Sequence, residues 1–285
     1  MIPARNEARN LPGCLAAIGT GFAEDIVVVD SSSEDTTEAI AREAGVRYVN
    51  FHWNGRFPKK RNWFLREHRP NSKWVLFLDA DEYLTDAFKN EVRRALCSTD
   101  NVGFWLNYTK YFLGKSLKGG YPLRKLALFR VGAGEYEQIP ESEWSTMDME
   151  VHEHPELDGP IGEIKARIDH RDFRSVASWL VKHVEYAKWE AKRFEMLTQR
   201  NREHWTPVQK IKYALMGTPL IGPVFFFGSY LLMGGFRDGA RGFAFCLLKA
   251  AYFTQVYCLI KEQRQQSAQM ETKSAAPQDL ETSLP

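Results

Sequence analysis

The sequence predicts an α/β fold in which strands and helices alternate, followed by an apolar helical region. Residues 26–29 and 74–78 form two continuous apolar runs, and an aspartate directly follows each run. Such runs are typical of strands that a parallel sheet buries on both faces. Helix-length segments lie between them, and this alternation indicates a sheet with right-handed crossovers. Residues 214–236 contain no charged side chain, which predicts the apolar helical region.

The elements of the first half follow from their boundary residues. Asn10 is of a type that caps helices, which predicts a helix over residues 11–18. Asp35 and Glu38 have the spacing of a capping box, and the helix that they begin is expected to stop at Gly45. The other expected elements are strands at 46–49, 102–108 and 126–130 and helices at 59–68, 85–97 and 172–200.

Composition and charge exclude several classes of protein. Of the 285 residues, 44% are hydrophobic and 26% charged, which excludes a mostly disordered, collagen-like or coiled-coil chain. The formal net charge of +2 argues against a dedicated nucleic-acid-binding protein. No Cys-x-x-Cys pair occurs, so we expect reduced thiols and neither a zinc ribbon nor a redox motif (Cys14, Cys97, Cys246 and Cys258). The chain also opens without the basic and then apolar start of a signal peptide.

The C-terminal third has the composition of a membrane-associated region. Residues 214–236 are long enough to cross a bilayer, but two prolines and five glycines argue against a straight spanning helix. Residues 242–260 carry one charge, on Lys249. Basic residues flank both stretches, which is typical of interfacial helices or a membrane-seated hairpin (Lys210, Lys212, Arg237, Arg241, Lys261 and Arg264). We expect membrane association over residues 205–262, with a buried helical pair as the alternative, and a disordered tail over 263–285.

The strongest chemical signal is the segment Asp79-Ala80-Asp81, directly after a predicted buried strand. Ligands of α/β sheets bind beyond the carboxyl ends of the strands, and Asp30 falls at the same edge. Two carboxylates separated by one residue can face one hard cation, and Mg²⁺ or Mn²⁺ held there would neutralise a nucleotide diphosphate. Asp30 can accept a hydrogen bond from a base or a ribose, and the alternative is that it caps the next helix.

Together these residues resemble family-2 inverting glycosyltransferases. Their GT-A fold is a nucleotide-diphospho-sugar transferase fold, with a Rossmann-like mixed sheet flanked by helices. The resemblance covers about residues 1–110 and is carried by four segments: 2–7, 28–37, 61–62 and 77–82. Later segments resemble the lipopolysaccharide core β-1,4-glucosyltransferase subgroup (126–130, 151–154, 157–159, and 170 followed by 179–191). Members of this subgroup tend to end in an apolar region with basic flanks, like residues 214–260.

The resemblance implies roles for individual residues. Seven are expected at the donor nucleotide, the first four of them lining the base pocket (Pro3, Ala4, Arg5, Glu7, Asp30, Arg61 and Asp79). Asp30 would contact the base or ribose, and Asp79 the ribose or the metal. Asp81 is expected as the principal ligand of Mg²⁺ or Mn²⁺, with His170 as a further metal or diphosphate contact. Glu153 is expected as the general base, because inversion needs a carboxylate that takes the acceptor's proton as its oxygen attacks C1.

The sequence departs from the family pattern at three places. Only Met1 and Ile2 precede Pro3, so the first, central strand is expected to be missing or truncated, leaving unpaired backbone groups in the sheet. Arg5 stands where many relatives have tyrosine, which removes a stacking ring from the base pocket. Ala127 stands where the pattern has an arginine.

Two of these motifs have an alternative interpretation. His152, Glu153 and His154 could belong to a zinc site, but their spacing differs from the His-Glu-x-x-His of zinc proteases. The cations around Arg61 could form a solvated helix face, whereas the resemblance favours Arg61 as a ligand contact (Lys59, Lys60, Arg61, Arg66 and Arg69).

We therefore expect a metal-dependent hexosyltransferase. It would move a glucose-like sugar from a nucleotide donor, UDP-linked, to a hydroxyl of a membrane glycolipid such as lipopolysaccharide core, at the cytoplasmic face of the inner membrane. Residues 1–200 would form the transferase domain, with a donor half at 1–110 and an acceptor half at 111–200. Two alternatives stay open: transfer to a polyprenyl phosphate, which needs no general base, and a non-catalytic membrane-bound protein that binds nucleotide sugars.

Overall fold

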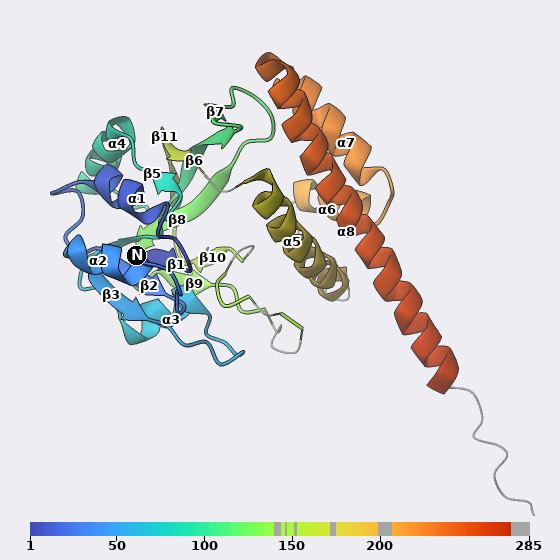
Figure 1. Cartoon of the computed structure of the whole chain (residues 1–285), viewed down its shortest axis with the longest axis horizontal. Coiled ribbons are helices and arrows are strands. Elements are labelled where there is room, and N and C mark those ends of the chain that lie inside the picture. The colour runs from blue at the N-terminus through green and yellow to red at the C-terminus, as the bar shows by residue number, and fades with distance from the viewer. Residues whose placement is uncertain (140–143, 146, 151–152, 172–174, 199–206, 275–285) are drawn as a thin grey trace, which may run out of the picture. The chain divides into compact units, whose positions relative to one another are not determined.

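The computed structural model describes the chain except for residues 140–143, 146, 151–152, 172–174, 199–206 and 275–285 (Figure 1). The chain forms two compact units, residues 1–173 and 174–285. Each unit has a hydrophobic core of its own.

The first unit begins with three parallel strands. These are β1 (Ile2–Ala4), β2 (Val27–Asp30) and β3 (Arg47–Asn50), and β1 pairs with β2 in the register Ile2↔Val28. The first strand is therefore present, as a strand of three residues. The gap expected beside it is not seen, because the Met1 nitrogen donates to Leu76 O at 2.9 Å and Leu78 N donates to Met1 O at 3.1 Å. These bonds join β1 to the neighbouring sheet.

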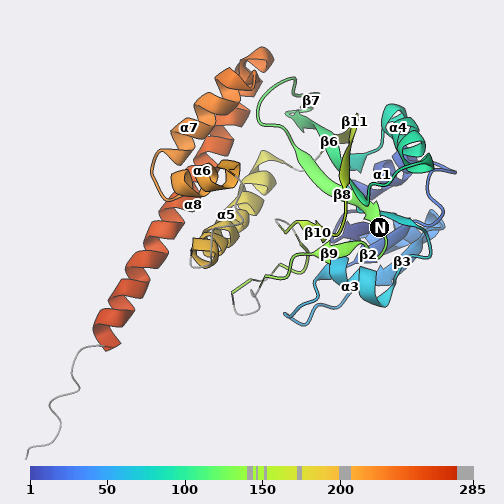
Figure 2. The same ribbon diagram turned by 180° about the vertical axis from the view of Figure 1, so that it is seen from behind.

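That sheet has the order β4-β8-β6-β11-β5 and is mixed (Figure 2). The pair of β6 and β11 is parallel, and the remaining pairs are antiparallel. The strands are β4 (Trp74–Leu76), β5 (Glu82–Tyr83), β6 (Gly103–Phe112), β8 (Arg124–Arg130) and β11 (Ile161–His170). A short β7 (Lys115–Ser116) pairs with β6, and β9 (Gly134–Tyr136) pairs with β10 (Pro155–Leu157).

Four helices accompany the strands, close to the predicted positions: α1 (Leu11–Ile18), α2 (Thr37–Glu43), α3 (Lys60–Glu67) and α4 (Asp86–Cys97). Gly45, with φ of +68°, follows the end of α2 as expected. The predicted caps of α1 and α2 were wrong. The Asn10 side chain donates to Glu7 instead of accepting from α1, and Thr36 takes the N-cap position of α2. Asp35 accepts from Ala8 N and Thr37 N, so it ties two loops together.

The second unit is helical. The helix predicted at 172–200 is α5 (Val176–Thr198), and it is followed by α6 (Pro207–Met216), α7 (Ile221–Phe227), a π-helical turn η1 (Gly228–Leu232), a 3₁₀ turn η2 (Gly235–Asp238) and α8 (Gly239–Ser274). Small and aromatic side chains of α5 pack against α8 in the core of this unit (Ala187, Ala191, Phe194, Tyr252, Val256 and Ile260). The unit therefore begins with α5, whereas the sequence suggested a boundary near residue 200.

Candidate functional site

Three loops of the first unit meet where β1, β2 and β4 end. The parallel register places Ala4 opposite Asp30, and Ser31 N donates to Ala4 O at 3.0 Å. Asp79 follows β4, which β1 joins through the Met1 bonds. The carboxyl ends of these strands therefore bring Asp30 and Asp79 to one edge of the sheet, as the sequence predicted.

Asp30 organises the loop that follows β2. Its carboxylate is fully buried and accepts from Ser33 N and Ser33 Oγ, at 2.7 and 2.5 Å, and from the Tyr48 hydroxyl at 2.9 Å. Burial and this hydrogen bond raise the pKa of Tyr48 above its ordinary value, so the hydroxyl stays a donor. In this structure Asp30 thus holds the loop over residues 31–33 in place. It does not cap the next helix.

The segment expected at the nucleotide base is braced against the same loop. Asn6, with φ of +56°, donates its N–H to Ser33 Oγ at 2.7 Å, and Glu7 N donates to Thr37 Oγ1 at 2.9 Å. Arg5 is exposed, whereas Pro3 and Ala4 are buried in β1. The Glu7 carboxylate accepts from the Asn10 side chain at 2.7 Å. The four predicted base-pocket residues are therefore adjacent in space, with Arg5 the most accessible of them.

Asp79 lies between two cations. Arg61 Nη2 is 2.9 Å from Asp79 Oδ1, and Lys125 Nζ is 2.5 Å from Asp79 Oδ2. Burial works to raise the pKa of Asp79, but Lys125 and Arg61 outweigh it and hold the pKa well below its ordinary value. Asp79 is therefore a permanent carboxylate at neutral pH.

Lys125 also binds Glu82, a residue that sequence reasoning missed. The Lys125 Nζ atom is 2.5 Å from Glu82 Oε1. The other oxygen of the Glu82 carboxyl, which is buried, accepts a hydrogen bond from Asp79 N. Lys125 lies in β8 two residues before Ala127, and the register of β8 against β6 shifts between Leu126 and Leu128. The cation that contacts Asp79 in this part of β8 is therefore Lys125.

Asp81 and His170 form a donor set that fits a divalent cation. His170 ends β11, and its Nε2 is 3.5 Å from Asp81 Oδ1. Ligand atoms about 2.1 Å from one octahedral ion lie about 3 Å apart, so a small side-chain adjustment brings both atoms onto one ion. No group of three His, Cys, Asp or Glu side chains is arranged around one point among the described residues. Phosphate oxygens and water would complete the shell, as is usual for Mg²⁺.

The start of α3 carries three consecutive cations, and all three are buried. The exposed fractions of Lys59, Lys60 and Arg61 are 5%, 2% and 8%, so the solvated-face interpretation is wrong for them. Lys60 Nζ donates to Ala4 O at 3.0 Å and lies 3.3 Å from Asp148 Oδ2. Burial lowers the pKa of Lys60, and Asp148 partly offsets that effect. Arg66, further along α3, is exposed.

Glu150 closes the start of α3, and sequence reasoning missed it as well. Its two oxygens accept from Arg61 N and Asn62 N at 2.9 and 3.0 Å, and Arg61 Nη1 donates to Glu150 O. A carboxylate on these N–H groups replaces the missing side-chain cap and suits the positive end of the helix. The sequence signal for such an acidic partner is a predicted helix that starts with three cations and has no capping residue of its own.

The proposed general base, Glu153, is 5% exposed and accepts from Lys59 Nζ at 2.7 Å. Asp148, Glu150 and Glu153 therefore contact three consecutive cations of α3, which fixes this segment beside the sheet edge. Residues 151–152 lie outside the described part of the chain, and with them His152 of the zinc alternative.

The sequence profile described as "Glycosyl transferase family 2" matches residues 1–138, which contain this sheet edge and the start of α3. The lipopolysaccharide core biosynthesis glycosyltransferase LpsC of Rhizobium meliloti is 25% identical over 256 residues, covering 87% of this chain and 85% of LpsC. This part of the chain, residues 1–138, belongs to glycosyl transferase family 2. The LpsC match extends over both units and agrees with the expected resemblance to the lipopolysaccharide core subgroup.

Other proteins match this chain to differing extents. A TPR repeat-containing protein of Synechococcus elongatus is 35% identical over 100 residues, which is 35% of this chain and 24% of that protein. Among solved structures, S. aureus TarS 1-349 covers 93% of this chain and 90% of its own, with 14% identity and a TM-score of 0.42. Glucosyl-3-phosphoglycerate synthase from Mycobacterium tuberculosis, in complex with Mn²⁺ and UDP, covers 39% and 42%, with 22% identity and a TM-score of 0.31. The mixed sheet flanked by helices, together with the family match, is the expected GT-A-type fold.

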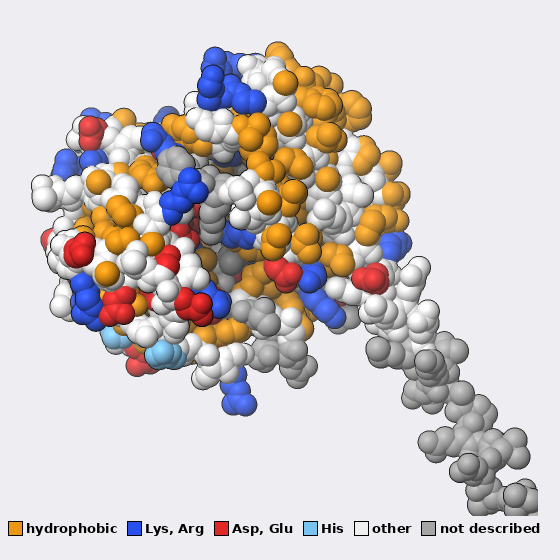
Figure 3. All heavy atoms as spheres, in the orientation of Figure 1, with side chains coloured by type: hydrophobic (Ala, Val, Ile, Leu, Met, Phe, Trp, Pro, Cys, Tyr) orange, Lys and Arg blue, Asp and Glu red, His pale blue; other side chains and the backbone are white. Residues whose placement is uncertain are grey.

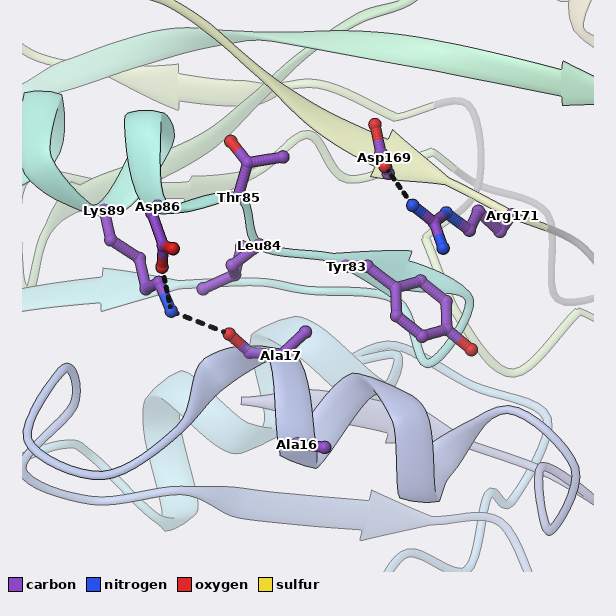
Figure 4. A pocket seen from close by; sticks show the side chains of 9 residues that line it. All are labelled: Ala16, Ala17, Tyr83, Leu84, Thr85, Asp86, Lys89, Asp169 and Arg171. Atoms are coloured by element: carbon purple, nitrogen blue, oxygen red, sulfur yellow. Dashed lines mark hydrogen bonds and ion pairs between the residues drawn. The ribbon is translucent and has the colours of Figure 1, made fainter. Parts of the chain in front are cut away.

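One open hollow of about 420 Å³ lies beside the family-2 site (Figure 4). Its charged side chains are paired with one another: Lys89 with Asp86 at 3.0 Å, and Arg171 with Asp169 at 2.5 Å. Asp169 and Arg171 flank His170, so strand alternation directs them away from the face that His170 shares with Asp81. The hollow is therefore separate from the two-carboxylate site (Ala16, Ala17, Tyr83, Leu84, Thr85, Asp86, Lys89, Asp169 and Arg171).

Replacing Glu150 tests whether its carboxylate caps the N-terminus of α3 in the family-2 domain. We expect Glu150→Gln to lower the free energy of unfolding by about 1–3 kcal/mol, because the backbone N–H of Arg61 or of Asn62 loses its acceptor and the Arg61 guanidinium loses a nearby negative charge. Urea denaturation followed by circular dichroism measures it. Glu135→Gln is the matched control, because Glu135 binds the exposed Arg66 near the other end of α3 and should cost less than about 1 kcal/mol. Equal effects of the two variants would contradict the capping role.

Glu82 predicts a pH dependence of stability. Burial raises the pKa of Glu82 to about 8, from an ordinary glutamate value of 4.5. The folded state then holds a proton that the unfolded state releases, so this contribution to stability is present at low pH and is lost as the pH rises from about 5 to 8. The slope approaches about 1.4 kcal/mol per pH unit.

The neutral variant Glu82→Gln lacks this dependence. Between pH 5.5 and 8 we expect its free energy of unfolding to gain more than about 1 kcal/mol relative to the wild-type protein. Urea titrations at several pH values measure the difference. Glu67→Gln is the control, since Glu67 is exposed on α3. A difference that stays constant with pH would contradict a protonated Glu82.

Proposed function

We propose that this protein transfers a hexose from a nucleotide sugar, UDP-linked, to a hydroxyl of a membrane glycolipid such as lipopolysaccharide core, with inversion at C1. The observation that carries the proposal is the pair Asp79 and Asp81 at the carboxyl edge of the sheet, with Arg61 and Lys125 on Asp79 and His170 near Asp81. This arrangement of carboxylates and cations suits a nucleotide diphosphate, and it lies in the part of the chain that matches family 2.

The donor would lie along the loops after β1 and β2. The base and ribose would contact Pro3, Ala4, Arg5 and Glu7, with Asp30 shaping the loop beside them. Arg5 is the exposed member of this group and has a long cationic side chain that can lie against a base or reach a phosphate. Arg61 would hold Asp79 toward the ribose, since its guanidinium bonds both Asp79 and the backbone of residue 150.

Asp81 and His170 would hold Mg²⁺ or Mn²⁺, with Asp79 next to them. A divalent cation bound there would supply neutralisation of the charge that develops on the leaving diphosphate. The part played by the chain is to keep the carboxylates ionised and oriented. Lys125 keeps Asp79 ionised and oriented through their ion pair. The backbone N–H of Arg171 donates to the Asp81 carbonyl at 2.8 Å and fixes the backbone at Asp81.

Glu153 would take the proton of the acceptor hydroxyl as the oxygen attacks C1 of the sugar. A general base has to be ionised and within hydrogen-bond reach of that proton. Lys59 donates to Oε1 of Glu153, which orients the carboxylate and balances its charge. The start of α3 connects Glu153 to the donor side, because Lys60 and Arg61 contact Ala4 and Asp79.

The acceptor would be lipid-linked and reached from the cytoplasmic face of the inner membrane. In the described part of the chain, one helix, Gly235–Gln269, is long and apolar enough by length and composition to cross a membrane, and an 18-residue stretch within it has a mean hydropathy of 1.6. The relative LpsC carries lipopolysaccharide core biosynthesis in its name. An apolar helical region beside a transferase unit on one chain supports an acceptor at a membrane.

Binding of UDP tests the donor site. We expect calorimetry to detect UDP binding that requires Mn²⁺ or Mg²⁺, and Asp81→Ala to weaken it by at least about 10-fold because the chain loses its main metal ligand. Asp100→Ala is the control, since Asp100 is exposed and lies after α4. Binding that is unchanged in Asp81→Ala, with normal circular dichroism, would refute the assigned metal site.

Turnover of UDP-sugar tests the general base and separates the two enzyme hypotheses. For transfer to a hydroxyl, Glu153→Gln should lower kcat by about 10²-fold or more and leave UDP binding intact. Transfer to a polyprenyl phosphate needs no base, and activity would then survive. Glu156→Gln, an exposed glutamate on β10, is the control. Absence of turnover in the wild-type protein across a broad acceptor mixture would favour the non-catalytic alternative.

A further inference from the structure

The turn between α7 and α8 exposes a group of large apolar side chains. We call it the hairpin tip and define it by six residues: Phe227, Leu231, Leu232, Met233, Phe236 and Phe243. Leu232 is 89% exposed, and the other five are 45–57% exposed. Figure 3 shows hydrophobic side chains gathered over this part of the second unit. A contiguous apolar patch on a surface marks a site of interaction with a protein or a membrane.

We propose that the hairpin tip inserts into the headgroup and upper acyl region of an anionic phospholipid bilayer, and that α8 does not cross the bilayer. The proposal rests on the membrane-bound acceptor of the proposed function and adds the mode of attachment. It concerns the second unit alone.

The first arm of the hairpin is too short to span. The apolar segment of α7 and η1 is Ile221–Leu232. These twelve residues reach about 18 Å at 1.5 Å per residue, against about 30 Å for the hydrocarbon core. A hairpin with this arm can enter one leaflet and return.

The outward face of α8 is apolar only at its beginning. Phe243 and Leu247 are the last large hydrophobic side chains that the described part of α8 exposes. The exposed positions that follow are small or polar, namely Ala251, Thr254, Gln255 and Cys258. A spanning helix would present apolar side chains to lipid along its full length, whereas α8 does so over its first three turns.

The rest of α8 is engaged with polar and charged partners in its own unit. Lys249 Nζ lies 2.9 Å from His183 Nε2 and over the ring of Trp179, and Arg264 binds Glu195 on α5 at 2.7 Å. Burial of these charges in hydrocarbon would be costly. We therefore expect the contacts of Lys249 and Arg264 to lie outside the hydrocarbon core of the bilayer.

The charges beside the tip favour an anionic surface. Two cations lie beside the tip: Arg237 is exposed, and Arg241 lies one turn further along the chain. The one acid between residues 214 and 261, Asp238, is buried. Juxtamembrane cations contribute about 1 kcal/mol each near an anionic leaflet, so this charge asymmetry favours an anionic lipid surface.

Vesicle flotation tests the insertion. We expect the full chain to float with vesicles of phosphatidylcholine and phosphatidylglycerol. Leu232→Gln/Phe236→Gln should reduce its partition into the vesicles by at least about 10-fold, because two apolar side chains that would enter the bilayer are lost. Leu113→Gln, at an exposed leucine of the first unit, should float like the wild-type protein. Equal flotation of the double variant, or equal binding to phosphatidylcholine alone, would overturn the proposal.

A label on Cys258 tests whether α8 enters the core of the bilayer. In a Cys97→Ser background Cys258 is the exposed thiol, because Cys14 and Cys246 are buried. Position 258 lies six residues from the middle of the stretch Gly235–Gln269, so in a spanning helix it would be about 9 Å from the bilayer centre and shielded. We expect a fluorophore on Cys258 to stay open to aqueous iodide when the protein is on vesicles. Shielding from iodide would show a spanning helix and overturn the proposal.

Two further measurements separate the possible failures. Light scattering without lipid tests whether a second copy covers the tip: a wild-type dimer that the double variant abolishes would overturn the proposal. UDP binding by the double variant should match that of the wild-type protein, because the tip lies outside the first unit. Loss of flotation with retained UDP binding therefore concerns the tip, whereas flotation of a chain that binds no UDP would count against the proposed function instead.

Discussion

Three buried cations at the start of α3 hold the candidate site together. Lys60 contacts the end of β1, Arg61 contacts Asp79, and Lys59 contacts Glu153. A buried charge without its partner costs several kcal/mol, so these side chains require the acidic segment around Glu150 to be in place. The helix, the sheet edge and that segment therefore depend on one another.

The same electrostatics separate two neighbouring carboxyls. Asp79 and Glu82 both contact Lys125, yet their pKa values move in opposite directions. Arg61 contacts Asp79 in addition, whereas burial dominates at Glu82. Asp79 is thereby kept charged at the candidate site, whereas Glu82, which is buried, can hold a proton.

The second unit combines an apolar tip with a polar body. Its core joins α5 and α8 through small and aromatic side chains, and the pairs Lys212–Glu190 and Arg264–Glu195 bind further helices to α5. By hydropathy alone, the stretch Gly235–Gln269, which contains most of α8, is a candidate membrane span. The packing divides it into a first part that exposes large apolar side chains and a second part that does not, and this division decides how it can meet a membrane.

The sequence by itself determined the α/β alternation and the two-carboxylate segment, because continuous apolar runs, Gly45 and the aspartates after the strands are local signals. It was wrong about the caps at Asn10 and Asp35, whose side chains bond other loops instead. Only the tertiary structure decided that a three-residue β1 completes the sheet, and that Glu150 and Lys125 belong to the site. The contacts of Lys125 with Asp79 and of Glu150 with Arg61 join residues 46 and 89 positions apart, and no local pattern encodes such a partner.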